Sequence, residues 1–495
     1  MTIIRAWGKR VQDPYEKGIA ALYSQNYPDA TRELSKSLEA RRCQVRKAQC
    51  EFADAAFFLG NSLFQEGKYR DALTAYQDAA TLRPDDMVLV SNIGSCLLKL
   101  GKYSEAETLY TRALSQNERS LGSEHVEIAT NLHNLAELYA NIGSLPKAES
   151  LSRRALSMDT KLLGADNTKV AIDLGQLAQL LQQKGDYDAA EPLLRRALDI
   201  DEQSQGANHP DVGRDLNNLA SLMMNKSSPA DADPLFRRAL SINEKAFGVE
   251  HPEVASTLNN LAMCIQAMGD YNSPEPLLRR ALDINEKMLG LNHPTTAITL
   301  NNLAVLLKLR ADYSGAEPLF RRALAIDEQA FGHENPKVAE DLGNLAELLD
   351  ERRAYAQAEP QYRQALNIYE KVLGQSHPSL IPTLNSLADL RRERGDFTEA
   401  DALYARAVNI EKTASVVDSL RTCTLTGLAQ LRTDEGNLSA GGVVANAAPF
   451  PYQATAVGLQ WFRSRDSRQR RVPLCEREAT TKPGAHHRAR SESQP

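Results

Sequence analysis

The sequence predicts an all-α solenoid of about ten helix hairpins, and three regularities support this fold class. The tetrapeptide RRAL recurs at steps of 42 residues, at 153–156, 195–198, 237–240, 279–282 and 321–324. Two further alanine registers keep the same step, one running from 106 to 400 and one from 136 to 388. Self-similarity at such a period indicates stacked supersecondary units, each burying its apolar face against the next.

The composition and charge argue against several classes of protein. Of the 495 residues, 42% are hydrophobic and 25% charged, and the net charge of -6 is too small to indicate nucleic acid as the main partner. No apolar run approaches the roughly 18 residues of a membrane helix, and the first residues do not read as a signal peptide. The six cysteines lack metal-site or disulfide spacing, so we expect reduced thiols in a cytoplasmic protein.

The chain divides in order into four parts. Residues 1–13 are an N-terminal extension, and 14–413 form the repeat array, which begins with a degenerate hairpin at about 14–48 and a 34-residue unit at 53–86. Residues 414–435 are expected to form a capping helix, because stacked repeats need a terminus that shields the last apolar face. Residues 436–495 hold nine Lys and Arg against four Asp and Glu and have no helical apolar stripe, which predicts a disordered basic tail.

Each 42-residue unit is predicted to contain two helices, which we call helix A and helix B. In 206–247, helix A has Val212, Leu216, Leu219 and Met223 at helical spacing, and the stretch KSSPAD separates it from helix B. The loops before helix A combine a glycine suited to a left-handed C-cap with a proline suited to the first helical turn.

The loops before helix A also carry a recurrent histidine. Asparagine takes the same place at 167 and 335, so we expect the side chain to cap the helix. A metal site made of these histidines is excluded, because equivalent loops lie about 8–10 Å apart while zinc needs donors at about 2 Å. The histidines in question are His125, His209, His251, His293 and His377.

Two features of helix B follow from residue type. Pro274 replaces a packing alanine, and since proline inside a helix costs about 3 kcal/mol, helix B should begin late there, near Ser273, and be short or kinked. The arginine pairs follow an acidic residue by four positions, which predicts a self-paired, solvated face.

No catalytic motif, cofactor loop or metal motif occurs, so the sequence predicts a protein that is not an enzyme and needs no cofactor.

The units resemble a known family. Gly60, Ala72, Tyr76, Ala79 and Pro84 match the tetratricopeptide pattern. The longer units, with LGxxHPxVAxxLNNLAxL and AEPLxRRAL, are similar to the repeats of kinesin light chain and its bacterial relatives. The resemblance implies a right-handed superhelix with helix A on the concave face. It does not extend to a motor adaptor, because the heptad coiled coil of kinesin light chain has no counterpart in 1–13.

Two neighbouring columns of polar residues run along helix A, and they are the candidate peptide-binding site. A carboxamide offers both a donor and an acceptor, so a row of them can hold the backbone of an extended peptide. The first column contains Asn217, Asn259 and Asn301; the second contains Asn134, Asn218, Asn260, Asn302 and Asn344. Met224, Met263 and Val305 are expected to select peptide side chains. The alternative is that the amides stabilise the array itself.

These observations predict a non-catalytic scaffold that binds extended segments of partner proteins in its concave groove. The alternative is a regulatory arm, controlled by a small signal or by its own basic tail, that acts on a catalytic partner. Nucleic acid is expected to bind weakly at most, through the tail. The partner's identity and the oligomeric state have no signal in the sequence.

Overall fold

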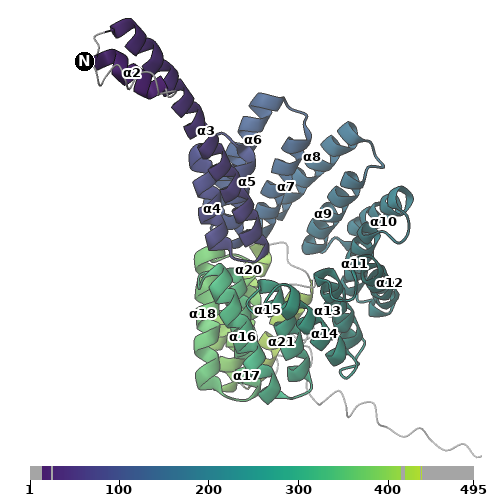
Figure 1. Cartoon of the computed structure of the whole chain (residues 1–495). Coiled ribbons are helices and arrows are strands. Elements are labelled where there is room, and N and C mark those ends of the chain that lie inside the picture. The colour runs from purple at the N-terminus through teal and green to yellow at the C-terminus, as the bar shows by residue number, and fades with distance from the viewer. Residues whose placement is uncertain (1–13, 24–25, 414–417, 435, 437–495) are drawn as a thin grey trace, which may run out of the picture. The chain divides into compact units, whose positions relative to one another are not determined.

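The computed structural model describes residues 14–23, 26–413, 418–434 and 436. Every regular element in these ranges is an α-helix, as the sequence predicts. The chain forms two compact units, the first ending at Gly122 and the second beginning at Ser123. Figure 1 shows the antiparallel helix pairs of each unit. The expected extension 1–13 and nearly all of the tail lie outside the described residues.

The first unit departs from the predicted division into hairpins. Its second helix is continuous over 39 residues, so the segment expected to end the hairpin at about 48 also supplies helix A of the unit at 53–86. That unit keeps its signature contact, because a Cβ atom added at Gly60 would lie 2.6 Å from the Tyr76 ring. The helices are α2 (Pro14–Tyr23), α3 (Tyr27–Gln65), α4 (Tyr69–Leu82), α5 (Met87–Lys99) and α6 (Tyr103–Leu121).

The second unit contains the 42-residue repeats, in which odd-numbered helices up to α19 are helix A and even-numbered helices up to α20 are helix B. Each helix packs on its neighbours in the chain, and successive helices A also touch at α9–α11, α11–α13, α13–α15 and α17–α19. The helices are α7 (Val126–Asn141), α8 (Leu145–Leu163), α9 (Thr168–Lys184), α10 (Tyr187–Gln205), α11 (Pro210–Asn225), α12 (Pro229–Phe247), α13 (Pro252–Ala267), α14 (Pro274–Met288), α15 (Pro294–Leu309), α16 (Tyr313–Phe331), α17 (Pro336–Glu351), α18 (Tyr355–Leu373), α19 (Leu380–Glu393), α20 (Phe397–Thr413) and α21 (Asp418–Asp434).

The recurrent alanines lie where helices approach most closely. The RRAL alanines Ala155, Ala197 and Ala239 are all completely buried, as are their equivalents to Ala407. Leu219, Leu261 and Leu303 are at most 3% exposed. Because a methyl group lets helices approach more closely than a larger side chain does, this repeated small residue fixes the spacing of the array. Helix α21 follows the last repeat and packs on α19 and α20.

The loop histidines cap helix A, as predicted. Nδ1 of His209 accepts a hydrogen bond from the backbone N–H of Asp211 at 3.3 Å, and His125, His251 and His293 make the same contact one or more repeats away. Asn167 and Asn335 cap with their side-chain oxygens. The glycine that ends helix B has positive φ at every position between Gly122 and Gly374 where the loop pattern places one.

The prolines of helix B lie at two different positions in the helix. Helix α14 begins at Pro274 and has 15 residues, whereas its neighbours α12 and α16 have 19, so the late start is confirmed. The in-phase prolines, such as Pro192 and Pro234, lie inside the helix at its sixth residue. This position is beyond the first four amides, so each proline removes one backbone hydrogen bond.

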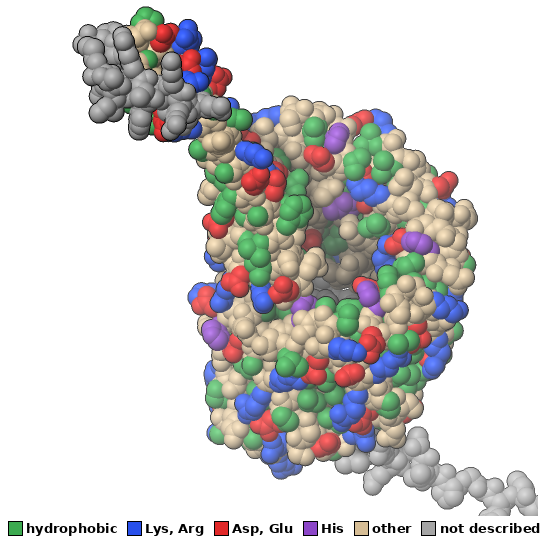
Figure 2. Space-filling model, viewed as in Figure 1, with side chains coloured by type: hydrophobic (Ala, Val, Ile, Leu, Met, Phe, Trp, Pro, Cys, Tyr) green, Lys and Arg blue, Asp and Glu red, His purple; other side chains and the backbone are tan. Residues whose placement is uncertain are grey.

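The arginine pairs of helix B form ion pairs with acidic side chains. The first arginine of each pair contacts the acidic residue four positions earlier, as Arg195 does with Glu191 at 2.7 Å. The second arginine reaches helix B of the preceding repeat at Arg238, Arg280 and Arg322, as Arg238 does with Glu202 at 2.6 Å. Basic and acidic side chains accordingly alternate over the surface in Figure 2. This face is a self-compensated seam between repeats, which matches the predicted solvated face. No helix in the described part of the chain is long and apolar enough to cross a membrane.

Candidate functional site

The two polar columns occupy different environments on helix A. In the second unit, Figure 2 shows the surface hollowed beside α9 and α11. The second-column residues Asn134, Asn218 and Asn260 are half-buried. The first-column residues Asn259 and Asn301 are each only 5% exposed. Burial alone does not separate the columns, because Asn217 of the first is also half-buried, while Asn302 and Asn344 of the second are 0% and 1% exposed. The two columns differ in their hydrogen bonds.

The first column bonds the repeats to one another. The Nδ2 group of Asn217 donates to the hydroxyl of Thr257 at 3.1 Å, and Asn259 donates to Thr299 at 2.9 Å. Asn301 donates to Oδ1 of Asp341 at 2.6 Å. In each case the acceptor lies on the next helix A, so this column stabilises the array, which is the alternative that the sequence left open.

A residue of helix B completes each of these contacts, and we call the set of three an inter-repeat triad. Asn243 on α12 donates to the Thr257 hydroxyl at 3.0 Å, so Thr257 accepts from both asparagines while donating to the carbonyl of Glu253. Asn285 and Thr299 repeat the arrangement one interface later. Buried polar groups are stable only when hydrogen-bonded, and a triad satisfies the Thr hydroxyl completely.

Three triads contain two carboxyl groups, and each compensates them differently. Asp201 and Asp215 share the guanidinium of Arg214, at 2.7 and 3.1 Å. Burial, opposed by Arg214, raises the pKa of Asp215 to about 7. At Asp327 and Asp341 no arginine intervenes; burial raises both pKa values, that of Asp341 to about 7, which favours a proton shared by the pair.

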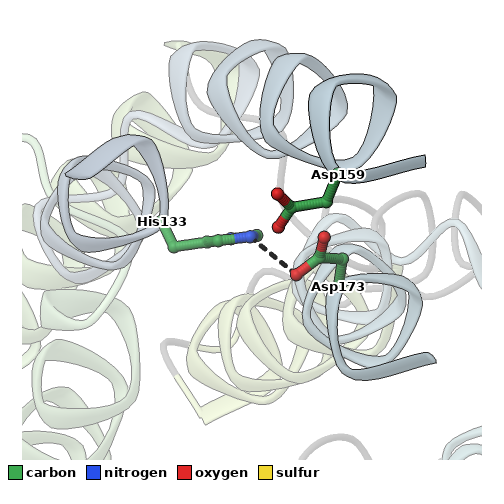
Figure 3. Close-up of side chains that lie close together, drawn as sticks. All are labelled: His133, Asp159 and Asp173. Atoms are coloured by element: carbon green, nitrogen blue, oxygen red, sulfur yellow. Dashed lines mark ion pairs between the residues drawn. The ribbon is translucent and has the colours of Figure 1, made fainter. Parts of the chain in front are cut away.

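The third acidic triad contains a histidine. His133 on α7, Asp159 on α8 and Asp173 on α9 point toward a common centre (Figure 3). Nε2 of His133 lies 2.8 Å from Oδ1 of Asp173, and Nζ of Lys169 lies 2.8 Å from Oδ2 of Asp159. Both aspartates are at most 1% exposed. Burial raises the pKa of Asp159, and the carboxylate of Asp173 adds to this effect while Lys169 opposes it.

The second column keeps most of its amide groups unused. Asn134, Asn218 and Asn260 make no hydrogen bond to another described side chain, and Nδ2 of Asn218 lies over Gly175, which has no side chain to receive it. Asn344 is 1% exposed, yet neither its Oδ1 nor its Nδ2 has a hydrogen-bond partner among the described residues. Asn302 is the exception, because its Nδ2 donates to Asn259 at 3.2 Å.

The three apolar candidates are not equivalent. Met263 is half-buried on α13. Met224 is 2% exposed and packs in a core cluster with Leu181 and Phe236, and Val305 is 1% exposed in the next cluster. Met263 is thus the one of the three whose side chain reaches the surface in the described structure.

The sequence reasoning missed the partners of the first column. Asp173, Asp215, Thr257, Thr299 and Asp341 occupy one register of helix A, and Asp159, Asp201, Asn243, Asn285 and Asp327 one register of helix B. The signal was available, since a polar residue recurring at 42-residue steps among buried positions indicates a repeated internal contact.

Comparison with known proteins identifies the repeats. The model of the tetratricopeptide repeat family matches six segments, of which the last five overlap in succession: 86–161, 169–245, 215–287, 253–329, 296–371 and 342–413. A second family model, described as anaphase-promoting complex, cyclosome, subunit 3, matches residues 27–113. Among curated proteins, two Plasmodium falciparum sequences described as Hsp70-Hsp90 organising protein are 48% identical over 48 residues, or 10% of this chain. The match spans only 19% and 8% of those relatives.

Solved structures with similar helix arrangements share little sequence. The TPR-like repeats of a putative kinesin light chain from Podosopora anserina are 24% identical, cover 41% of this chain and 97% of that chain, and give a TM-score of 0.36. BtubC (BKLC) from P. vanneervenii is 20% identical, covering 54% and 96%, with a TM-score of 0.36. A Rap protein complexed with Competence and Sporulation Factor is 14% identical, covering 73% and 98%, with a TM-score of 0.44. On the family match, which covers well over half of the sequence, the chain belongs to the tetratricopeptide repeat family.

Proposed function

We propose that this protein is a non-catalytic scaffold that holds extended segments of partner proteins on helix A of the second unit. Tetratricopeptide repeats generally mediate contacts between proteins. One observation carries the finer assignment: every first-column Nδ2 group donates within the array, whereas neither amide group of Asn134, Asn218, Asn260 or Asn344 bonds a described side chain. Carboxamide groups that are removed from water and make no hydrogen bond lower the stability of the array, unless a ligand supplies the missing hydrogen bonds.

Backbone recognition is the chemistry that this column favours. Each carboxamide accepts a hydrogen bond from a peptide N–H and donates one to a peptide C=O, without regard to the peptide side chain. Asn134, Asn218 and Asn260 are the members that a peptide can reach directly, because they are half-buried, whereas Asn344 is 1% exposed. Half-buried Met263 supplies an adaptable apolar contact between these amides.

The compartment is part of the proposal. The five cysteines in the described part of the chain, two of them buried, are all free thiols. Burial raises the pKa of Cys96 and of Cys264 to about 12, which keeps both as unreactive thiols. Reduced, unpaired cysteines suit the cytoplasm, and we assign the scaffold to that compartment.

The test is binding of selected peptides to the full chain. Unstructured peptides of random sequence are selected against the parent protein, and the affinity of the best binders is then measured for a variant with Asn134, Asn218, Asn260 and Asn344 all changed to Ala. We expect each lost amide contact to weaken binding about 5- to 100-fold. N-methylation of alternate peptide amides should have a similar effect, since the contact is to the backbone.

A matched control keeps the experiment specific. Arg195→Ala and Arg237→Ala alter helix B and should leave peptide affinity unchanged, because both arginines pair with their own helix. The proposal fails if the four-alanine variant, shown to be folded by its circular dichroism and melting, binds the selected peptides as the parent does.

A further inference from the structure

The triad of His133, Asp159 and Asp173 differs chemically from the others in the array. At the equivalent places the array has asparagine or glycine on the first helix A and, in two triads, a threonine hydroxyl as the central acceptor. Here an imidazole nitrogen and two carboxyl groups come from three separate helices, with one ligand atom from each residue within 4.8 Å of the others. One nitrogen and two oxygens from fixed helices form a donor set that first-row divalent cations take.

Unused ligand atoms point into this centre. Lys169 engages Oδ2 of Asp159, and His133 engages Oδ1 of Asp173. This leaves Oδ1 of Asp159 and Oδ2 of Asp173 without a hydrogen-bond donor among the described residues, on side chains that are 0% and 1% exposed. A buried, unpartnered carboxylate oxygen is costly, and a cation removes that cost.

The neighbouring triad indicates that a cation belongs here. At the next interface the guanidinium of Arg214 lies between Asp201 and Asp215, in a repeat where Gly175 stands at the place of His133. In the His133 triad the residue at the place of Arg214 is Ile172, so no arginine fills the gap. Lys169 contacts Asp159, and among the described residues the imidazole of His133 is the one ion-pair partner of Asp173.

We propose that His133, Asp159 and Asp173 bind one divalent transition-metal ion, for which Zn²⁺ is the best fit. Zinc accepts three protein donors at about 2.0–2.2 Å and completes its shell with water, so the donor atoms must contract to about 3.4 Å separations. The His133 side chain is 13% exposed, which gives water and the ion access to the centre. Such an ion would clamp α7, α8 and α9 and so fix two successive repeats.

The experiment titrates Zn²⁺ alone into the full-length protein at pH 7.5 by calorimetry, with a weak competing chelator to suppress surface sites. We expect one tight site per chain and a higher melting temperature on loading. His133→Asn should weaken binding at least about 10-fold yet fold normally, because asparagine stands at this place in other repeats and Asn301 bonds Asp341 there. Cobalt, used as a spectroscopic probe, should lose its site absorbance in the same variant.

Three variants separate a metal site from a structural polar contact. His209→Asn preserves a helix cap of the kind Asn167 makes, and Asp341→Asn alters a triad without histidine; both should bind Zn²⁺ as the parent does. Lys169→Met removes the cation that competes for Asp159 and should tighten binding. The proposal is overturned if His133→Asn retains the parent's affinity, if the parent shows no site that survives the chelator, or if Lys169→Met weakens binding.

Discussion

The imidazole of His377, in the loop before α19, lies against the backbone of Gly143, in the turn between α7 and α8. A Cβ atom added at Gly143 would lie 2.7 Å from Nε2 of His377. The histidine is 9% exposed, and its Nδ1 accepts from the backbone N–H of Ser379 at 3.2 Å. Residues that are distant in the sequence thus meet within the second unit.

This contact predicts acid lability. Burial lowers the pKa of His377 from 6.5 to about 4, so the folded state favours the neutral ring. Its contribution is complete above the unfolded pKa of 6.5 and is lost as the pH falls toward 4, to a total of about 3 kcal/mol. Urea unfolding of the parent at pH 7.5, 5.5 and 4.5 measures the loss. His377→Asn, which keeps a capping side chain, should flatten this dependence; an unchanged acid loss in that variant would contradict the assignment.

The same contact can be tested from the glycine side. Gly143→Ala should destabilise the protein by more than Gly395→Ala, the equivalent turn six repeats later. Both glycines have positive φ, +77 and +82, so both variants carry the backbone cost of about 1 kcal/mol. Nothing lies within 4 Å of a Cβ at Gly395, so the excess at Gly143 measures the His377 contact. Equal unfolding free energies for the two variants would exclude a close contact.

The Asp327–Asp341 pair predicts the opposite pH dependence. Burial raises both carboxyl pKa values, that of Asp341 to about 7. A folded pKa above the unfolded one gives stability that is complete below about pH 4 and is lost as the pH rises through 7. Asp341→Asn imitates the protonated acid, and its melting temperature relative to the parent should rise between pH 5 and pH 8. A constant difference would mean that no proton is shared.

The two asparagine columns should respond differently to alanine. Asn259→Ala removes the donor to Thr299 and the acceptor of Asn302, and we expect a loss of about 1–3 kcal/mol in unfolding free energy. Asn218→Ala removes a half-buried side chain without a bonded partner, so the change should stay within about 0.5 kcal/mol. Chemical denaturation measures both. Equal losses would remove the distinction on which the binding proposal depends.

The late start of α14 predicts local mobility. Hydrogen exchange at 270–276 should be faster than at 312–318, the equivalent segment of the next helix B. Pro274→Ala restores the residue type of Ala232 and Ala316, and we expect it to extend the helix toward Tyr271 and to slow exchange there. Exchange that is equally slow in both segments of the parent would contradict this.

The features of this fold that the sequence predicts are those set by residues close together in the chain. Four such features were predictable from residue spacing, because each depends on residues a few positions apart. They are the helix pairs, the helix cap made by His209 and its equivalents, the arginine pairing and the start of α14. The continuous α3 was not, because nothing between 48 and 53 states whether two helices join or part. Nor was the division of the chain at Gly122, whose loop keeps the same punctuation as every other loop.

The site was predictable only to the level of its columns. Both asparagine columns are evident in the sequence, but which of the two bonds to the next repeat depends on the rotation of helix A. Asn217 and Thr257 are 40 residues apart and meet through the packing of α11 on α13. The depth of Met224 has the same origin, since a shift of one residue along a helix moves a side chain from the surface to the core.

Among the described residues, the series of inter-repeat triads is interrupted at the interface between α17 and α19. From α11 to α17, a hydrogen bond donated by an asparagine joins each repeat to the next. At the following interface Gly343 contributes no side chain, Tyr369 fills the place of the helix B polar residue, and no hydrogen bond joins Tyr369 to Thr383 among the described contacts. The next interface is fastened again, by Asn385 and Thr424. Ion pairs nearer the surface join the repeats of α17 and α19 instead, as Arg363 does with Glu399 at 2.7 Å and Arg406 with Glu370 at 2.5 Å. Salt should therefore weaken this interface more than the interfaces that buried amides join.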